Sequence, residues 1–207
     1  MYNEALPLLK KAASLYPLND SILVSMAAAN KNIGNSAEAE NLLLQALKMN
    51  PMNPATNGNL LALYASTNNL VKAEQMMQDI KIKKLDHPDV FFGQGIYYIK
   101  LQKFEDAKIV IEKGLVQSPD NTSATANLAK IYYLQGNINK TIELYEKFLS
   151  LNPDDALISA FVGSLYLNNI KNKNKALHYL KKALQIDPQN ADADKWRSII
   201  TQIEKTP

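Results

Sequence analysis

The chain of 207 residues carries 23 basic and 20 acidic side chains and no cysteine, which leaves a formal net charge of +3. This length fits one domain or one continuous array of repeats, and the lack of cysteine excludes disulfides, thiolate metal sites and cysteine nucleophiles. A charge this small, with Arg197 as the only arginine, argues against a surface that binds nucleic acid or reads phosphate.

No apolar run of the sequence approaches the roughly 18 to 20 residues that a membrane-spanning helix needs, so no membrane span is expected. The absence of cysteine does not decide the compartment, because a reducing cytoplasm and an oxidising periplasm both tolerate such a chain. We expect a soluble protein and favour the cytoplasm over the periplasm.

The first expected element is a helix over residues 3–16, in which Ala5, Leu9 and Ala12 recur at helical spacing. Leucines cover more than one face of this helix, whereas a terminal cap would have a polar outer face. We therefore expect a helix that lacks its preceding partner, and hypothesise that further repeats or another domain precede Met1. The unpaired helix is also a candidate surface for self-association.

Residues 20–53 have the pattern of two helices separated by a tight turn. Gly34 marks the turn, because glycine takes the left-handed backbone that ends a helix, and Pro51 follows the second helix, which a proline cannot continue. Ser36 is expected to cap the start of the second helix, with acidic side chains in the first turn behind it.

This two-helix unit recurs along the rest of the chain at a step of about 34 residues, the period of a known helical repeat. In most of these units a tyrosine, a proline and a small residue recur at fixed positions. The three sets are Tyr64, Tyr98, Tyr132 and Tyr166; Pro17, Pro51, Pro119, Pro153 and Pro188; and Ala5, Ala39, Ala73, Ala107, Thr141 and Ala176. Each tyrosine is expected to fill the gap between its two helices, so that truncation to alanine costs about 3–5 kcal/mol.

Two units depart from this pattern. In residues 54–87, Leu85 stands in the proline slot and Ile80 replaces the small residue at which second helices pack, so wider helix spacing is expected there. In residues 156–190, the turn over 168–175 contains an extra residue and several lysines. Exposed turns accept such insertions, and we favour a solvated loop over a basic contact patch.

The last helix is expected over residues 191–204. Ala193, Trp196, Ile200 and Ile203 recur at helical spacing and should face back onto the preceding unit, while the opposite side of the helix is polar. A polar outer face is typical of a terminal capping repeat, so we interpret this end of the array as native.

This register resembles that of the tetratricopeptide-repeat (TPR) family. The resemblance rests on a small residue in the first helix, an aromatic residue one turn later, a turn glycine, a small residue in the second helix and a following proline. In the central unit these are Ala129, Tyr132, Gly136, Thr141 and Pro153. The resemblance covers nearly the whole chain. It implies an all-α fold, a solenoid of antiparallel helix pairs wound into a right-handed superhelix, and a function in protein–protein interaction.

The same register sets the organisation of a single array. Its parts are 1–19 as a half repeat with the second helix only, 20–53, 54–87, 88–121, 122–155 and 156–190 as repeats 1 to 5, and 191–207 as a C-terminal capping helix.

In the TPR family the first helices line a concave groove, so one face of each first helix supplies candidate partner-binding residues. These are Asn59, Phe92, Ile96, Ile99, Asn127, Lys130, Tyr133, Phe161, Ser164 and Asn168. Exposed apolar groups on such a wall indicate an interaction site, and the resemblance implies that Asn59 and Asn127 bond the backbone of an extended peptide. For Phe92 the alternative of a core position between helices is equally open. The family's two-carboxylate clamp is matched only at Asn59, so a co-chaperone of that type is not expected.

Few residues could carry catalysis. His87 lies between Asp86 and Pro88, and we favour a helix-capping role over metal or acid–base chemistry. The sequence has no phosphate-binding loop, His-Glu-x-x-His motif or nucleophile elbow, so no active site, metal or cofactor is expected.

The sequence therefore predicts a non-enzymatic scaffold that binds a peptide or helix of a partner protein in the concave groove, and no nucleic acid. Two alternatives stay open. One is an accessory or substrate-recruiting arm of a larger enzyme, such as a glycosyltransferase-type modifying enzyme. The other is a self-assembly module that uses the N-terminal half repeat.

Overall fold

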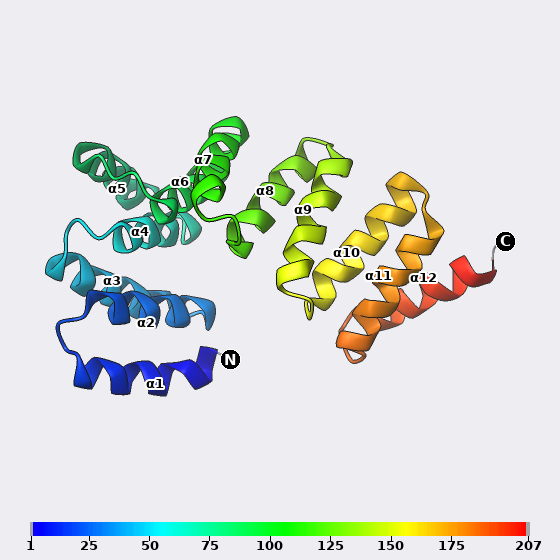
Figure 1. The fold of residues 1–207 in the computed structure, drawn as a ribbon, viewed down its shortest axis with the longest axis horizontal. Helices are drawn as coiled ribbons and strands as arrows, with labels where there is room; N and C mark the ends of the chain where they lie inside the picture. The colour runs from blue at the N-terminus through cyan, green and yellow to red at the C-terminus, as the bar shows by residue number, and fades with distance from the viewer. Residues whose placement is uncertain (1, 206–207) are drawn as a thin grey trace. The chain divides into compact units, whose positions relative to one another are not determined.

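The computed structural model describes residues 2–205, and in that range the regular structure is helical with no strand (Figure 1). It begins with α1 (Tyr2–Leu15) and ends with α12 (Ala193–Lys205). The helices between them come in pairs joined by short turns. These are α2 (Asp20–Asn32) with α3 (Ser36–Met49), α4 (Pro54–Ser66) with α5 (Leu70–Lys83), α6 (Pro88–Lys100) with α7 (Phe104–Gln117), α8 (Thr122–Leu134) with α9 (Ile138–Leu151), and α10 (Ala156–Leu165) with α11 (Lys173–Ile186). The predicted all-α architecture of helix pairs is confirmed.

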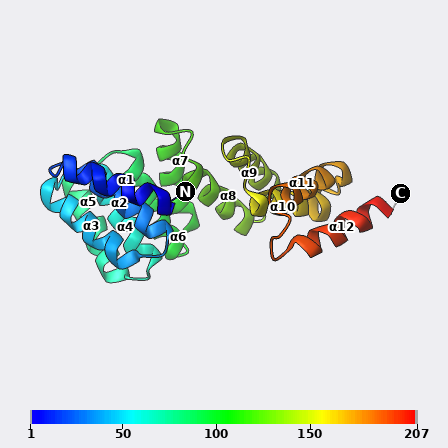
Figure 2. The ribbon, with the colours of Figure 1, turned by 90° about the horizontal axis from the view of Figure 1, so that it is seen from below.

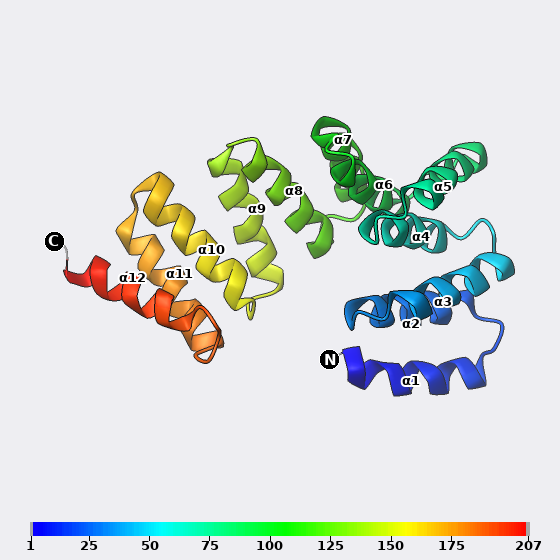
Figure 3. The same cartoon turned by 180° about the vertical axis from the view of Figure 1, so that it is seen from behind.

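The chain divides into two compact units, unit 1 (Met1–Pro119) and unit 2 (Asp120–Pro207). The boundary lies two residues before the junction predicted between repeats 3 and 4. Within unit 1, α1 packs on α2, and α2 lies alongside α3 (Figure 3). Within unit 2, α8 pairs with α9, α10 pairs with α11, and α12 packs on α11 (Figure 2). No helix of the described residues is both long enough and apolar enough to cross a membrane.

Small side chains allow the two helices of each pair to approach closely. The predicted small position is fully buried in every second helix of the pairs. The set is Ala39, Ala73, Ala107, Thr141 and Ala176. Thr141 fits because its hydroxyl donates to the carbonyl of Asn137, at 2.8 Å, and so is not left unpaired in the interface.

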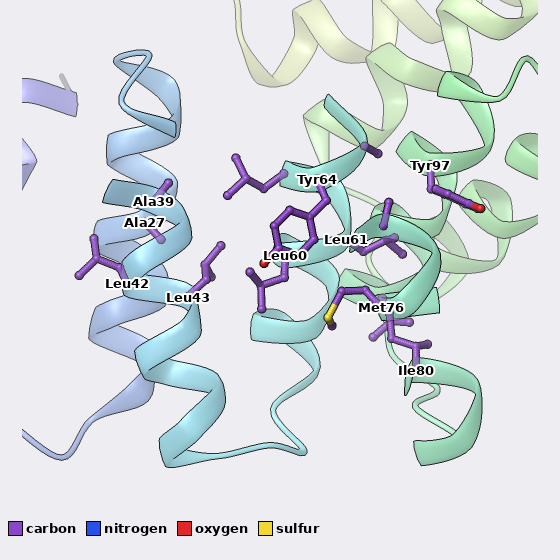
Figure 4. Close-up of a cluster of buried hydrophobic side chains, with 14 of the residues drawn as sticks. Ala27, Ala39, Leu42, Leu43, Leu60, Leu61, Tyr64, Met76, Ile80 and Tyr97 are labelled. Carbon is purple, nitrogen blue, oxygen red and sulfur yellow. The ribbon is translucent and has the colours of Figure 1, made fainter. Parts of the chain in front are cut away.

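Among the tyrosines of the register, Tyr64 and Tyr166 are buried, and Tyr98 and Tyr132 are half-buried. Figure 4 shows the core of unit 1, where Tyr64 lies beside Leu60 of the same helix and the small Ala39 belongs to the neighbouring pair. The core of this unit therefore runs from one pair to the next, as expected when neighbours cover each other's apolar faces.

Two glycines bring α4 and α6 into backbone contact. A Cβ atom added to Gly58 would overlap the carbonyl oxygen of Asp89, and one added to Gly93 would overlap the carbonyl oxygen of Gly58. Because no side chain separates these helices, α4 packs more closely against α6 than against its own partner α5. The wider spacing expected from Ile80 concerns residues 54–87, which form the α4–α5 pair, and Ile80 is buried there.

The extra residue of the last pair is absorbed by a π-helical turn, η1 (Tyr166–Ile170). After this turn Lys171 takes a left-handed backbone with φ 61°. Tyr166 before the insertion and Ala176 after it are both buried, so the packing register is retained on each side. The lysines of the turn are exposed, as the solvated-loop interpretation predicts.

The prediction that Ser36 caps α3 is wrong. The cap is Asn35, whose side chain accepts from the Glu38 N–H at 3.4 Å, and Ser36 is the first helical residue. Gly34, with φ 85°, ends the preceding turn. Asn35 directly after it therefore has the non-helical backbone of a cap residue, and its side chain accepts from the backbone N–H three residues later. The other second helices that start in this way are capped by Asn69, Asn137 and Asn172.

The C-terminal helix packs as the sequence predicts. Ala193, Trp196, Ile200 and Ile203 are all buried, and α12 lies against α11. The helix begins at Ala193, slightly later than the predicted residue 191, because the preceding residues form a turn.

Candidate protein-interaction surface

Three aromatic side chains from three helices of unit 2 form a contiguous group, here called the aromatic cluster: Tyr133 of α8, Tyr145 of α9 and Phe161 of α10. The ring centroids of Tyr133 and Phe161 lie 5.1 Å apart with an interplanar angle of 78°. Those of Tyr145 and Phe161 lie 5.6 Å apart at 86°. Both are edge-to-face arrangements, which contribute about 0.5–1.5 kcal/mol beyond the area that they bury.

Exposure decreases across the aromatic cluster. Tyr133 is 42% exposed, Phe161 is half-buried and Tyr145 is buried, at 7%. Burial raises the pKa of Tyr145, so its phenol stays neutral under Phe161. The cluster thus presents a fixed apolar surface whose outermost ring is accessible to solvent.

Polar candidates flank the aromatic cluster on the same helices. Asn127 and Lys130 precede Tyr133 at helical spacing on α8, where Asn127 is half-buried and Lys130 is exposed. On α10, Ser164 follows Phe161, and its hydroxyl donates to the carbonyl of Ala160 at 3.0 Å. Asn168 is exposed but belongs to η1, because α10 ends at Leu165.

The candidate residues of unit 1 are more engaged in packing. The Phe92 ring lies directly over Gly114 of α7, where an added Cβ would overlap it, and Phe92 is half-buried. Ile96 packs against the core of the unit, and Ile99 is half-buried. The Asn59 amide already donates to the carbonyl of Ala55 in its own helix, at 2.8 Å. The accessible aromatic surface among the candidates is therefore the one in unit 2.

The candidate residues predicted from the sequence do not include Tyr145. The residue supports Phe161 from a helix that does not belong to the predicted concave face. Its spacing from Phe161 does not follow the repeat period, so the register contains no signal for this contact.

His87 has the structural role that the sequence favours. It is the N-cap of α6, and its Nδ1 accepts from the Asp89 N–H at 3.3 Å. The Asp89 carboxylate lies 3.4 Å from the same nitrogen. Among residues 2–205, no group of three or more His, Asp or Glu is arranged to hold a metal ion.

Antiparallel helix pairs that repeat with a buried small residue and an interface tyrosine define an α-helical repeat protein. The tetratricopeptide-repeat profile matches residues 123–155 and 160–190, which are the last two complete pairs. Two repeats of the tetratricopeptide type are thus found where the sequence register predicts them.

Known proteins resemble the chain over different lengths. BBSome complex member BBS4 of Bos taurus is 30% identical over 112 residues, which are 53% of this chain and 21% of that protein. Cellulose synthase operon protein C of Pseudomonas fluorescens is 23% identical over 91% of this chain and 16% of its own length. The chain therefore spans a minor part of these relatives.

Solved structures show the same fold. The APC/C hetero-tetramer Cut9–Hcn1 matches 98% of this chain and 39% of its own with a TM-score of 0.75 at 16% identity. YrrB matches 92% of this chain and 97% of its own with a TM-score of 0.58 at 17% identity.

Proposed function

We propose that the chain is a protein-interaction module in which the aromatic cluster receives an apolar side chain from a peptide or helix of a partner protein. TPR proteins are typically scaffolds for protein–protein interaction, and within residues 2–205 no group of three or more His, Asp or Glu is arranged to hold a metal ion. The observation that carries the proposal is Tyr133, which is 42% exposed while its ring is held by Phe161.

Aromatic side chains of this kind suit a binding surface for two reasons. They offer a large contact area, and they lose little conformational entropy because few torsions are free. Phe161, which is fixed from below by Tyr145, restricts Tyr133 further. Residues at the centre of interfaces that are rigid and aromatic are enriched among binding hot spots. Lys130 and Asn127 then lie where a polar rim is expected, next to the apolar contact.

A peptide ligand is also supported by a fold neighbour. YrrB carries an unusual peptide-binding site. The exposed Lys130 favours a segment with an acidic residue close to its apolar anchor.

The test is affinity capture of the partner with the full chain, followed by direct titration of the purified partner against variants. Tyr133→Ala should weaken binding by about tenfold or more if Tyr133 is a hot spot. Tyr133 is largely outside the core, so the melting transition should stay cooperative and near that of the wild type.

Matched control residues lie on α8 and α10, the helices that carry Tyr133 and Phe161. Leu134 and Leu157 are exposed apolar residues, at 54% and 58%, that take no part in the aromatic cluster. Their alanine variants should bind as the wild type does. Equal binding by the Tyr133→Ala chain, or equal losses in the control variants, would contradict the proposal.

A second candidate function is self-association through α1 and the segment after it. Leu8, Leu15 and Leu18 are exposed at 71%, 64% and 88%, while Leu9 of the same helix packs against the core of unit 1. Sedimentation velocity over a range of concentrations should then show a dimer that Leu8→Glu together with Leu15→Glu converts to monomer. A monomer at all concentrations contradicts this candidate and leaves the aromatic cluster unaffected.

A further inference from the structure

Unit 1 contains a cleft between α5 and α6 that the sequence register does not predict. Gly58 and Gly93 hold α4 against α6, whereas α5 makes little contact with α6. The space between α5 and α6 has a volume of about 490 Å³. This lies in the usual range for ligand pockets, which is about 300–1,000 Å³.

Apolar and aromatic side chains form part of the lining of this α5/α6 cleft. Ile80 is buried at its base, and Met77 and Leu85 are half-buried beside it. Tyr97 and Tyr98 of α6 form the wall, with ring centroids 5.6 Å apart. Figure 4 shows the Tyr97 hydroxyl pointing away from the core of unit 1.

The rim of the cleft carries a surplus of positive charge. Lys81, Lys84 and Lys103 line it, all are exposed, and none of the three makes an ion pair within the described residues. The acidic side chain in the lining is Glu74. Its carboxylate accepts from the Tyr97 hydroxyl and, at 2.9 Å, from Gln78 Nε2.

Glu74 therefore does not neutralise the rim fully. The Tyr97 hydrogen bond is the main cause that lowers the pKa of Glu74, and the charge of Lys103 contributes less. The Glu74 carboxylate accepts hydrogen bonds from neutral donors, so its single negative charge offsets the positive charge of one of the three lysines. The remaining charge is available to an incoming anion.

Lys84 occupies a position where lysine is unfavourable. Its φ is 52°, in the left-handed region, where glycine or asparagine usually ends a helix. The backbone conformation is therefore not favoured by lysine, yet Lys84 is exposed and lines the cleft.

We propose that the α5/α6 cleft binds an acidic peptide segment of a partner protein, with one aliphatic side chain on the Ile80 floor and carboxylates on the lysine rim. Charge complementarity together with the apolar floor selects this ligand. Nucleic acid fits less well, because the cleft has no arginine to grip phosphate and Glu74 lies in its wall. The site is in unit 1 and does not depend on the aromatic cluster of unit 2.

The test uses the full chain and an array of short labelled peptides in which one leucine is moved through a run of glutamates. The matched array has glutamines in place of the glutamates. Peptides of the first array should bind, those of the second should not, and the affinity should fall as salt is raised. Chemical-shift changes should concentrate at Tyr97, Tyr98 and Leu85.

Lys84→Gly separates binding from folding, because glycine suits the left-handed backbone. It should bind the best peptide roughly fivefold more weakly, the scale of one exposed ion pair, while resistance to urea is unchanged or raised. Lys171→Gly is the matched control. Lys171 has φ 61° and lies in unit 2, so this variant should gain stability similarly and bind normally.

Three results would overturn the proposal. One is no difference between the glutamate and glutamine arrays. Another is full affinity in the Lys84→Gly chain. The third is equal or tighter binding of a single-stranded oligonucleotide at the same lysines, which would assign the cleft to nucleic acid.

Discussion

The Tyr64 hydroxyl donates a hydrogen bond of 3.2 Å to the carboxylate of Glu40, which belongs to the preceding helix pair. The same carboxylate accepts from Lys72 at 2.6 Å. Tyr166 repeats the arrangement in unit 2, where its hydroxyl donates to Glu146 at 2.7 Å and accepts from Lys175 at 2.8 Å. In both units an interface tyrosine thus joins its own pair to the one before it.

Tyr64→Phe and Tyr64→Ala should separate the two roles of this side chain. Loss of the hydroxyl should lower the free energy of unfolding by about 0.5–1 kcal/mol, since Glu40 keeps its bond to Lys72. Loss of the ring should cost about 3–5 kcal/mol, because a cavity forms between the helices. Urea denaturation measures both, and Tyr16→Phe, at an exposed site, should change nothing. Equal costs for the two variants would contradict this division.

Stability should fall at alkaline pH because of these buried phenols. Burial, followed by the charge of Glu40, raises the pKa of Tyr64 from 10.0 to about 12. Burial and the bond to Glu74 raise that of Tyr97 from 10.0 to about 12. The unfolded chain then loses these protons at lower pH than the folded chain. The stabilisation is therefore complete below pH 10 and is lost as pH rises towards 12.

Urea titrations across this window, with tyrosinate absorbance as a second signal, measure the effect. Tyr64→Phe should reduce the slope of stability against pH, and Tyr16→Phe should leave it unchanged. A slope that does not respond to Tyr64→Phe would assign the alkaline loss to other groups.

Gly58→Ala should disrupt unit 1 far more than the size of a methyl group suggests. The new Cβ would overlap the backbone carbonyl of Asp89, and backbone cannot move aside as a flexible side chain can. We expect a loss of several kcal/mol, at the upper end of overpacking effects. Gly136→Ala is the control, since no atom lies within 4 Å of its added Cβ, and only its left-handed backbone is strained.

Hydrogen exchange by mass spectrometry measures these two variants segment by segment. For Gly58→Ala, faster exchange should appear in α4 and α6. Unaltered exchange in both helices would show that they can separate at little cost.

The turn between the helices of each pair offers a stabilising change. Gly34, Asn68, Gln102 and Gly136 occupy equivalent positions and all have positive φ. Glutamine has no side-chain bond that favours this backbone, so Gln102→Gly should raise stability by up to about 1 kcal/mol. Asn68→Gly should gain less, because asparagine tolerates the left-handed region. A loss of stability in the Gln102 variant would contradict the argument.

The cap positions give a paired prediction. Lys103 is the N-cap residue of α7 and makes no side-chain cap hydrogen bond, whereas Asn137 caps α9 through the N–H of Lys140 at 3.2 Å. Lys103→Asn should stabilise the chain, and Asn137→Ala should destabilise it, each by about 1 kcal/mol. Thermal melts measure both. The Lys103 variant also removes one charge from the α5/α6 cleft, so its peptide affinity should fall while its melting temperature rises.

The helix pairs could be predicted because their signals recur at one spacing. Tyr64, Tyr166 and Ala39 are buried where the register places them. The Asn35 cap was also present in the sequence, since Asn69 and Asn137 repeat it, but serine is an equally good cap on local grounds. Only the position of the preceding turn distinguishes the two.

Other features have no periodic signal. The tyrosine–glutamate bonds use Glu40 in one unit and Glu146 in the other, which lie at different places in their helices. The contact of Gly58 with Gly93 depends on a tertiary approach of two helices that local sequence does not describe. Both the α5/α6 cleft and the support of Phe161 by Tyr145 follow from such contacts, so they could be found only in three dimensions.

The π-helical turn of η1 has a consequence for how such chains change in evolution. An insertion in an ordinary helix would rotate every later side chain by about 100°, whereas here Ala176 remains buried. A gain of one residue is thus confined to a single loop and leaves downstream copies untouched. Repeats of unequal length can in this way be inherited, duplicated or exchanged without a change in the packing of their neighbours.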